Sequence, residues 1–236
     1  MGIFPAIRYG LLLAVLVSGV SGCRTLSGNE TLFLSNLYSD QIRYGAVRLH
    51  SPFAPERLEK KLARELDAEL AAGATAQMRG MSREAFISRS AEALGQRSEA
   101  VTLGNNVFYR KNQYAADFAR GFPEVVNLSD LSLLAHELVH VWQHQNRART
   151  GYSLPAVARE HLQYKDPYAY AIKPGKPFLD YRFEQQGRMM QDYVFLAFQE
   201  PVLGDRDRAR LKQLRDLLET EFDLSDIRRT LTKAAS

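Results

Sequence analysis

The sequence predicts a single α+β domain that is mostly helical, with a small β hairpin or sheet. Two observations support this prediction: apolar residues recur at helical spacing in several segments, and only short segments are rich in β-branched or aromatic residues. The chain has 236 residues, of which 45% are hydrophobic and 25% charged, with 15 glycines and 9 prolines. These values are typical of a globular protein and exclude collagen-like, low-complexity and wholly disordered chains.

The charge pattern and the cysteine count exclude some classes of partner and site. Lysine and arginine total 31 against 27 aspartates and glutamates, which gives a net charge of +4, and the basic residues are scattered among acidic ones. Nucleic-acid-binding proteins usually carry a clustered basic patch, so the sequence indicates no nucleic acid partner. The single cysteine excludes an intramolecular disulfide and a cysteine-based zinc ribbon.

Residues 1–22 are predicted to be a signal peptide. A short start with one arginine, Arg8, precedes an apolar run over residues 11–17 and small residues that end in Cys23. The apolar run is too short to cross a bilayer, which requires about 20 apolar residues. The tetrapeptide Val20-Ser21-Gly22-Cys23 resembles the lipobox of bacterial lipoproteins. An ordinary cleaved secretory signal with a spare cysteine is the alternative.

The lipobox resemblance implies that the Cys23 thiol carries a diacylglycerol, that the chain is cut before Cys23, and that the new amino terminus is acylated. Acyl chains hold a protein on a membrane leaflet, since each buried methylene contributes about 0.8 kcal/mol. The residue after Cys23 is Arg24 and not an aspartate, which resembles lipoproteins sent to the outer membrane. In a Gram-negative host the domain would then face the periplasm from the outer membrane. Residues 23–36 are expected to be a lipidated tether, and residues 37–236 the folded domain.

The domain is predicted to begin with a strand and a helix. Val47 and Leu49 alternate with polar residues and indicate a strand over residues 42–50. A leucine at every fourth position predicts an amphipathic helix over residues 55–72, with Pro55 near its first turn.

A second helix and a hairpin are expected next. Ser82 is a suitable cap for a helix over residues 82–94. The apolar runs 101–103 and 107–109 flank a Gly-Asn-Asn turn, which predicts a β hairpin.

The second half of the domain is predicted to be helical on both sides of a long connection. Asparagine and aspartate caps and an apolar stripe predict a helix over residues 127–147. Residues 148–177 contain four prolines, so we expect a connection with at most one short helix. Further helices are expected over residues 179–198, 206–222 and 226–231.

The predicted helix over residues 127–147 contains His136-Glu137-Leu138-Val139-His140. Residues four apart share one helix face, so both imidazoles can bind one ion and Glu137 can contact the water on that ion. Two neutral imidazoles and an oxygen ligand suit zinc. The sequence therefore predicts one catalytic Zn²⁺ with His136 and His140 as ligands; the alternative is a surface helix with two unrelated histidines.

A catalytic zinc needs a third protein ligand and an open fourth position. His144 lies about 12 Å along the helix axis from His136, which is too far for one ion. His161, in the long connection, is a second candidate. We prefer Glu184, because Gly187 one turn later would let its helix pack closely against the metal helix; a solvated carboxylate is the alternative for Glu184.

The pair of histidines followed by Glu184 resembles the gluzincin zinc metallopeptidases, whose third ligand is a glutamate on a later helix. Residues 101–145 also resemble the metallopeptidase-like domain of bacterial toxins and of proteins linked to contractile injection systems. The motifs that carry this second resemblance are Thr102-Leu103-Gly104-Asn105, Tyr109, Gln113-Tyr114 and the segment 134–143. The long connection over residues 146–177 departs from the pattern of that family.

The gluzincin resemblance implies a mechanism. Zinc activates a water molecule and polarises the scissile carbonyl, while Glu137 accepts the proton as general base and passes it to the leaving amine. The oxyanion needs a donor, and the candidates are Tyr168, Tyr170, Tyr181, Arg182 and His161. Asp180 and Asp192 could orient a ligand imidazole. Gluzincins bind extended substrate on an edge strand, which we place at residues 107–110; a plain structural hairpin is the alternative for this segment.

The leading hypothesis is therefore a membrane-tethered zinc metallopeptidase, with a protein or peptide as substrate and the membrane as a partner through Cys23. Two alternatives stay open: a peptidoglycan amide hydrolase with the same zinc site, and a non-catalytic envelope lipoprotein with a structural metal or a partner surface. The presence of Glu137 favours an enzyme, since a structural site needs no base. The sequence does not indicate an oligomeric state.

Overall fold

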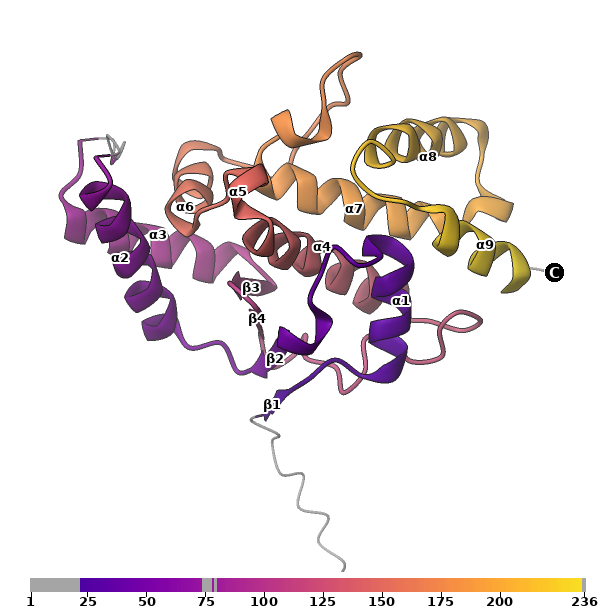
Figure 1. Ribbon diagram of the computed structural model, residues 1–236, viewed down its shortest axis with the longest axis horizontal. Coiled ribbons are helices and arrows are strands. Elements are labelled where there is room, and N and C mark those ends of the chain that lie inside the picture. The colour runs from indigo at the N-terminus through magenta and orange to yellow at the C-terminus, as the bar shows by residue number, and fades with distance from the viewer. Residues whose placement is uncertain (1–21, 74–77, 79, 235–236) are drawn as a thin grey trace, which may run out of the picture.

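The computed structural model describes residues 22–73, 78 and 80–234, and the helix α4 (Leu128–Gln145) lies at its centre. Every residue of α4 from 131 to 143 is buried, which is typical of a helix surrounded by other elements. Helix α7 (Phe183–Ala197) packs along α4 more extensively than any other described element. Figure 1 shows the two helices side by side, with the sheet on the other side of α4.

The sheet has four strands in the order β1-β2-β4-β3. Strands β1 (Gly22–Arg24) and β2 (Arg48–Ser51) are antiparallel, β2 and β4 (Asn106–Tyr109) are parallel, and β4 and β3 (Ala100–Leu103) are antiparallel. Gly104 turns the chain between β3 and β4 with a φ of 73°, a left-handed conformation that glycine adopts without strain. The predicted hairpin is confirmed, and it belongs to a larger sheet.

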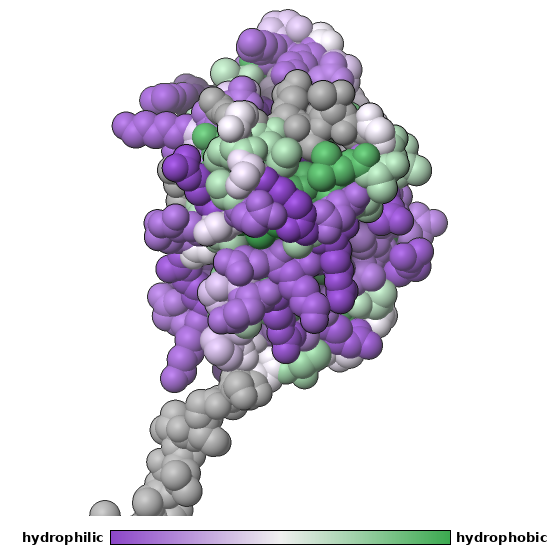
Figure 2. Space-filling model, turned by 90° about the vertical axis from the view of Figure 1, so that its left-hand side faces the viewer, coloured by the Kyte–Doolittle hydropathy of each residue, from purple (hydrophilic) through white to green (hydrophobic). Residues whose placement is uncertain are grey.

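Helices α2 (Pro55–Ala71), α3 (Arg83–Arg97) and α6 (Leu154–Gln163) enclose a second hydrophobic core beside the sheet. Three leucines of α2 at four-residue spacing are fully buried in it, as the sequence predicts. Figure 2 shows the outer face of this end of the molecule as mainly hydrophilic, with hydrophobic side chains gathered in one band near its top. The amphipathic helices therefore turn their charged sides outward.

Helices α1 (Gly28–Tyr38), α8 (Asp205–Leu218) and α9 (Ser225–Ala234) cover the main core at the other end of the molecule, where α1 contacts α9 (Figure 1). Short elements complete the described chain: α5 (Arg147–Thr150), η1 (Tyr44–Ala46), η2 (Phe178–Asp180) and η3 (Glu200–Val202). The predicted fold class, α+β and mostly helical, is confirmed.

The amino-terminal prediction is only partly covered by the structure. Residues 1–21, nearly all of the predicted signal peptide, lie outside the described part of the chain. Among the residues that are described, no helix combines the length and the apolar character that crossing a bilayer requires.

The structure corrects the expected tether over residues 23–36, because most of this segment belongs to the fold. Ser27 caps α1: its hydroxyl accepts the backbone N–H of Glu30, and the Glu30 carboxylate accepts the backbone N–H of Ser27. Phe33 and Leu34 of α1 are fully buried in the main core. Burial of these side chains fixes the segment on the domain.

Three other expectations are corrected. The strand expected over residues 42–50 begins at Arg48 and follows the turn η1. The connection over residues 148–177 was expected to hold at most one short helix, but it contains most of α5 and all of the longer α6. Helix α6 can form there because Pro155 lies in its first turn, where proline is tolerated. Residues 107–110 cannot supply an edge strand, because β4 is paired on both sides and β3 forms the edge.

Candidate metal centre

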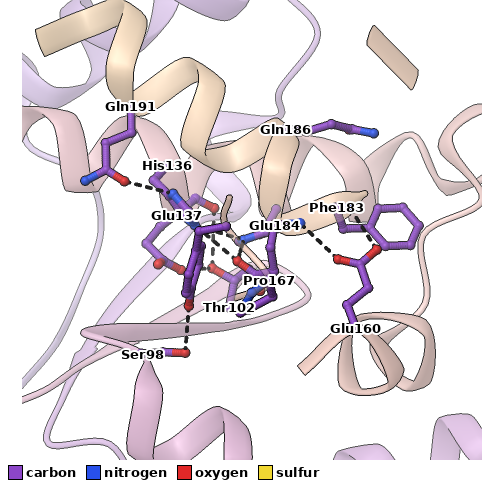
Figure 3. Close-up of polar contacts among 12 residues, drawn as sticks. Ser98, Thr102, His136, Glu137, Glu160, Pro167, Phe183, Glu184, Gln186 and Gln191 are labelled. Carbon is purple, nitrogen blue, oxygen red and sulfur yellow. Dashed lines mark hydrogen bonds and ion pairs between the residues drawn. The ribbon is translucent and has the colours of Figure 1, made fainter. Parts of the chain in front are cut away.

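Three buried side chains meet between α4 and α7. His136 and His140 lie one turn apart on α4, and Glu184 lies in the first turn of α7. The Nε2 atoms of the two imidazoles are 3.3 Å apart, and Glu184 Oε2 lies 3.4 Å from each of them. The structure therefore brings together the three predicted ligands as a buried group that could hold a metal ion (Figure 3).

The spacing of these three atoms fits a tetrahedral metal site. Bonds of about 2.0–2.1 Å from an ion to nitrogen and oxygen place neighbouring ligand atoms of a tetrahedron about 3.3–3.4 Å apart. The three observed separations of 3.3, 3.4 and 3.4 Å agree with that value. Three protein atoms at three corners leave the fourth corner for a non-protein ligand.

Glutamine side chains orient both imidazoles. The Nδ1 atom of His136 lies 3.1 Å from Gln191 Oε1, and that of His140 lies 2.8 Å from Gln143 Oε1. An amide oxygen only accepts hydrogen bonds, so each Nδ1 carries a proton, and the Nε2 atom of each imidazole in its neutral form presents a lone pair to the centre of the group. This is the tautomer that metal binding requires. Figure 3 shows Gln191 reaching His136 from α7.

Gly187 permits the close approach of α7 to α4. A Cβ atom at this position would lie 2.8 Å from His136 Nε2 and 2.9 Å from its Cε1 atom. Such distances are shorter than real Cβ contacts, so the imidazole occupies the space that any side chain at Gly187 would need. The close packing that the sequence suggested at Gly187 is present.

The charges of the group are coupled. Burial alone would raise the pKa of Glu184, but the charge of His140 and hydrogen bonds from the surrounding imidazoles hold that pKa well below its usual range. Burial would lower the pKa of His140, but the Glu184 carboxylate outweighs it and raises that pKa to about 9. In the metal-free protein the ionised carboxylate thus pairs with a protonated imidazole.

Glu137 lies beside the two histidines and is held by the sheet. The hydroxyl of Thr102, on β3, donates a hydrogen bond of 2.7 Å to Glu137 Oε2. Glu137 is only 4% exposed and lines the same cavity as the three candidate ligands. A carboxylate so placed can exchange a proton with a molecule bound in that cavity.

The cavity has a volume of about 20 Å³, which is room for about one water molecule. Tyr168, in the segment between α6 and α7, forms one wall: its ring centroid lies 5.8 Å from that of His136, and its hydroxyl lies 3.3 Å from Ser98 Oγ. Burial raises the pKa of Tyr168, which keeps the hydroxyl protonated and able to donate. Among the described residues, Tyr168 is the one candidate oxyanion donor from the sequence that lines this cavity.

Several predicted residues lie elsewhere. His144 is half-buried and contacts Gly104 and Tyr152, outside the cluster. The hydroxyl of Tyr181 accepts the backbone N–H of Lys173, which directs it away from the cavity.

The two aspartates predicted to orient an imidazole do not reach one. Asp192 accepts hydrogen bonds from Tyr170, Arg188 and Arg210, and Asp180 is exposed on η2. Glutamine amides orient the imidazoles instead. On α7, Gln191 lies on the helix face that carries Gly187 and faces α4, whereas Asp192 is rotated to the adjacent face. Cys23 is exposed on β1, with Sγ 3.9 Å from His50 Nε2.

The structure adds residues that the sequence reasoning missed. Gln191 follows Glu184 and Gly187 at helical spacing, so a search for polar residues on that one face of α7 could have found it. Gln143 could be found in the same way, three residues after His140. Thr102 comes from a distant strand, and no local pattern in the sequence connects it to Glu137.

Comparison with known proteins finds a related sequence over part of this chain. No family model matches the chain. The chain is 39% identical over 69 residues to the type VI secretion system spike protein VgrG2b of Pseudomonas aeruginosa, a match that covers 28% of this chain and 7% of the spike protein. It is homologous to VgrG2b over that segment. Among solved structures, the effector domain of P. aeruginosa VgrG2b aligns with a TM-score of 0.47 and 23% identity, over 86% of this chain and 88% of that one.

Proposed function

We propose that this chain is a zinc-dependent peptidase that hydrolyses peptide bonds. The observation that carries the proposal is the buried triangle of His136, His140 and Glu184 with the Glu137 carboxylate in the same cavity. Two imidazoles, one carboxylate and a free fourth corner are the ligand set of catalytic rather than structural zinc sites. A purely structural site would not need Glu137.

The residues present fit such an ion, which when bound would supply a Lewis acid for the substrate carbonyl and for a water molecule. Glu137 accepts a proton from the attacking water and returns it to the leaving amine; Thr102 holds Oε2 of this carboxylate and so fixes its direction. Tyr168, which lines the same cavity, supplies the hydrogen-bond donor for the oxyanion. Strand β3 is the sheet edge beside the cavity, and extended substrate would pair there.

The test combines metal analysis with a single substitution. Elemental analysis of protein purified without chelator should find about one zinc per chain, and His140→Ala should lose it. Glu137→Gln should keep the zinc and the fold but lose nearly all cleavage of a quenched peptide library. Zinc-loaded protein that cleaves no peptide, or a Glu137→Gln variant as active as the parent, would overturn the peptidase assignment. Cleavage of cell-wall fragments alone would favour the peptidoglycan hydrolase.

The homologous segment supports a further part of the proposal. VgrG2b, to which this chain is 39% identical over 69 residues, is a spike protein of a type VI secretion system. We infer that the present domain is a peptidase of the kind found in proteins linked to contractile injection systems. Release of the same peptide products by both proteins would test this relation.

We also propose that Cys23 carries a lipid anchor and that the domain faces the periplasm from the outer membrane. The lipobox-like segment ending at Cys23 supports this, and Cys23 is exposed on β1. Radiolabelled palmitate should enter the wild-type protein but not a Cys23→Ser variant, and only the wild type should float with outer membranes. Equal flotation of the variant would overturn the anchor.

A further inference from the structure

The carboxyl-terminal turn of α6 grips Glu184 at two points. The Glu160 carboxylate accepts the backbone N–H groups of Phe183 and Glu184, at 3.0 and 3.2 Å. The next residue, His161, places Nε2 2.9 Å from Glu184 Oε1. Figure 3 shows Glu160 directed at the first turn of α7. One turn of α6 thus holds both the backbone and the side chain of a candidate metal ligand.

Glu160 acts at the amino terminus of α7 as a cap supplied by another helix. The first backbone N–H groups of a helix lack partners within it, and a carboxylate there satisfies them and interacts favourably with the helix dipole. Because Glu160 binds the N–H of Glu184 itself, the backbone of that residue has little freedom. The direction of its carboxylate is then decided by the side-chain contacts.

Helix α6 is itself fixed by α2. Glu69 accepts hydrogen bonds from Ser153 and Arg159, both at 2.6 Å, and Glu65 accepts the backbone N–H of Leu154 at 2.9 Å. These contacts lie at the start and in the middle of α6, and the apolar side of the helix is buried in the second core. The grip on α7 therefore comes from a rigid support.

The two oxygens of Glu184 have different partners. Oε2 lies 3.4 Å from each ligand imidazole, whereas Oε1 lies against His161, whose side chain is fully buried. An ionised carboxylate only accepts hydrogen bonds, so His161 donates from Nε2. Oε1 is thus engaged on the side of the carboxylate away from the two imidazoles.

We propose that His161 is a positioning residue that reserves Glu184 Oε1, so that Glu184 binds metal through Oε2 alone and one coordination position stays open. The inference rests on the metal site of the proposed function. A carboxylate that binds through both oxygens takes up a further coordination position, which a catalytic site must keep for water or substrate. The long connection of residues 146–177, which departs from the pattern of the resembling family, supplies this device through α6.

The test compares His161→Leu, which removes the donor, with His161→Gln, which retains an N–H donor on a side chain of similar reach. His144→Leu is the matched control, since it makes the same substitution at a histidine of α4 outside the cluster. Each protein is loaded with Co²⁺, whose visible absorption weakens as its coordination number rises, and with zinc for kinetics. Melting of the metal-free proteins checks the fold, and His161→Met replaces the leucine variant if that variant unfolds.

We expect His161→Leu to keep about one metal per chain, to absorb more weakly with Co²⁺, and to lose about 10–100-fold in kcat with little change in KM. His161→Gln should recover most of the Co²⁺ absorption, and His144→Leu should match the parent. A leucine variant with the parent's spectrum and kcat would overturn the proposal, as would a glutamine variant no better than leucine. Failure of the parent to bind Co²⁺ or zinc would instead overturn the metal site itself.

Discussion

Replacing Gly187 by alanine should separate the stability of the fold from the integrity of the metal site. In an ordinary helix interior, alanine is more favourable than glycine by about 1 kcal/mol. At Gly187, however, the new Cβ would lie 2.8 Å from His136 Nε2, and ordinary contacts begin at 3.4 Å. The imidazole or the helix must therefore move by about 0.6 Å, a shift taken from these two distances.

The shift should affect both folding and metal binding. Overpacking of a buried site costs about 1–3 kcal/mol, so after the gain in helix propensity the metal-free Gly187→Ala protein should lose roughly 0–2 kcal/mol. Metal ligands tolerate only about 0.2 Å of error in bond length. A displacement of His136 three times larger should weaken zinc binding at least about tenfold, the lower end of what altered support of ligands costs.

The assay is a competition titration of zinc against a chromophoric chelator, with thermal melts in excess chelator and in excess zinc. Gly95→Ala on α3 is the matched control, because the nearest atom to its new Cβ is Phe53 Cε1 at an ordinary 3.5 Å. The control should gain about 0.5–1 kcal/mol and bind zinc as the parent does. A Gly187→Ala protein with the parent's zinc affinity would refute the argument that contact between the helices limits the position of His136.

Three further predictions follow from other contacts. With a pKa of about 9, His140 is protonated at pH 7 in the metal-free protein, so zinc binding should release about one proton and become tighter as pH rises toward 9. Calorimetry in buffers of different ionisation enthalpy would measure this proton release. The raised pKa also means that the stabilisation of the fold by the His140 ion pair is complete below about pH 6.5 and is lost as pH rises through 9. Thr102→Val removes the hydroxyl that orients Glu137, and kcat should fall about tenfold at unchanged zinc content; an unchanged kcat would contradict that role. Arg24→Ala leaves the fully buried Glu30 carboxylate without its ion pair, and chemical denaturation should show a loss of about 3 kcal/mol, whereas a loss below 1 kcal/mol would show that β1 contributes little to the fold.

The chemical centre could be read from local sequence because its spacing is a helix property. His136, Glu137 and His140 lie within two turns of α4, and helical geometry alone places the imidazoles on one face. Glu184 required a second argument, the absence of a side chain at Gly187, and the structure supports that argument because the His136 imidazole occupies the space that a Cβ atom at Gly187 would need. The contacts that orient the candidate ligands and Glu137 join residues far apart in the sequence. The periodicity of apolar residues does not predict which strand or helix will pack against α4.

The amino-terminal segment shows a different limit. The sequence predicts a tether over residues 23–36 because this segment is small and polar with little periodicity. The capping pattern of Ser27 and Glu30 before an apolar run was nevertheless present in the sequence. Glu30 also accepts from Arg24 and from the backbone of Phe118, and this last contact spans 88 residues. Local capping could have predicted α1, but its attachment to the core depends on a partner that only the tertiary fold provides.

The closed form of the cavity sets a condition on peptide hydrolysis. The cavity volume of about 20 Å³ holds about one water molecule, whereas four residues of extended peptide span about 13 Å. The three candidate ligands and Glu137 are each at most 5% exposed, so extended substrate cannot reach them in this form. Helix α4 and strand β3 belong to the packed core and cannot withdraw without disrupting it. Side chains of α3 and α6 also line the cavity, but the segment that carries Tyr168 lies between helices and is held to Ser98 by a hydroxyl contact of 3.3 Å. Under the proposed peptidase function we therefore expect a peptide to gain access by displacing that segment, and its return would bring Tyr168 back to the position from which it can donate to the oxyanion.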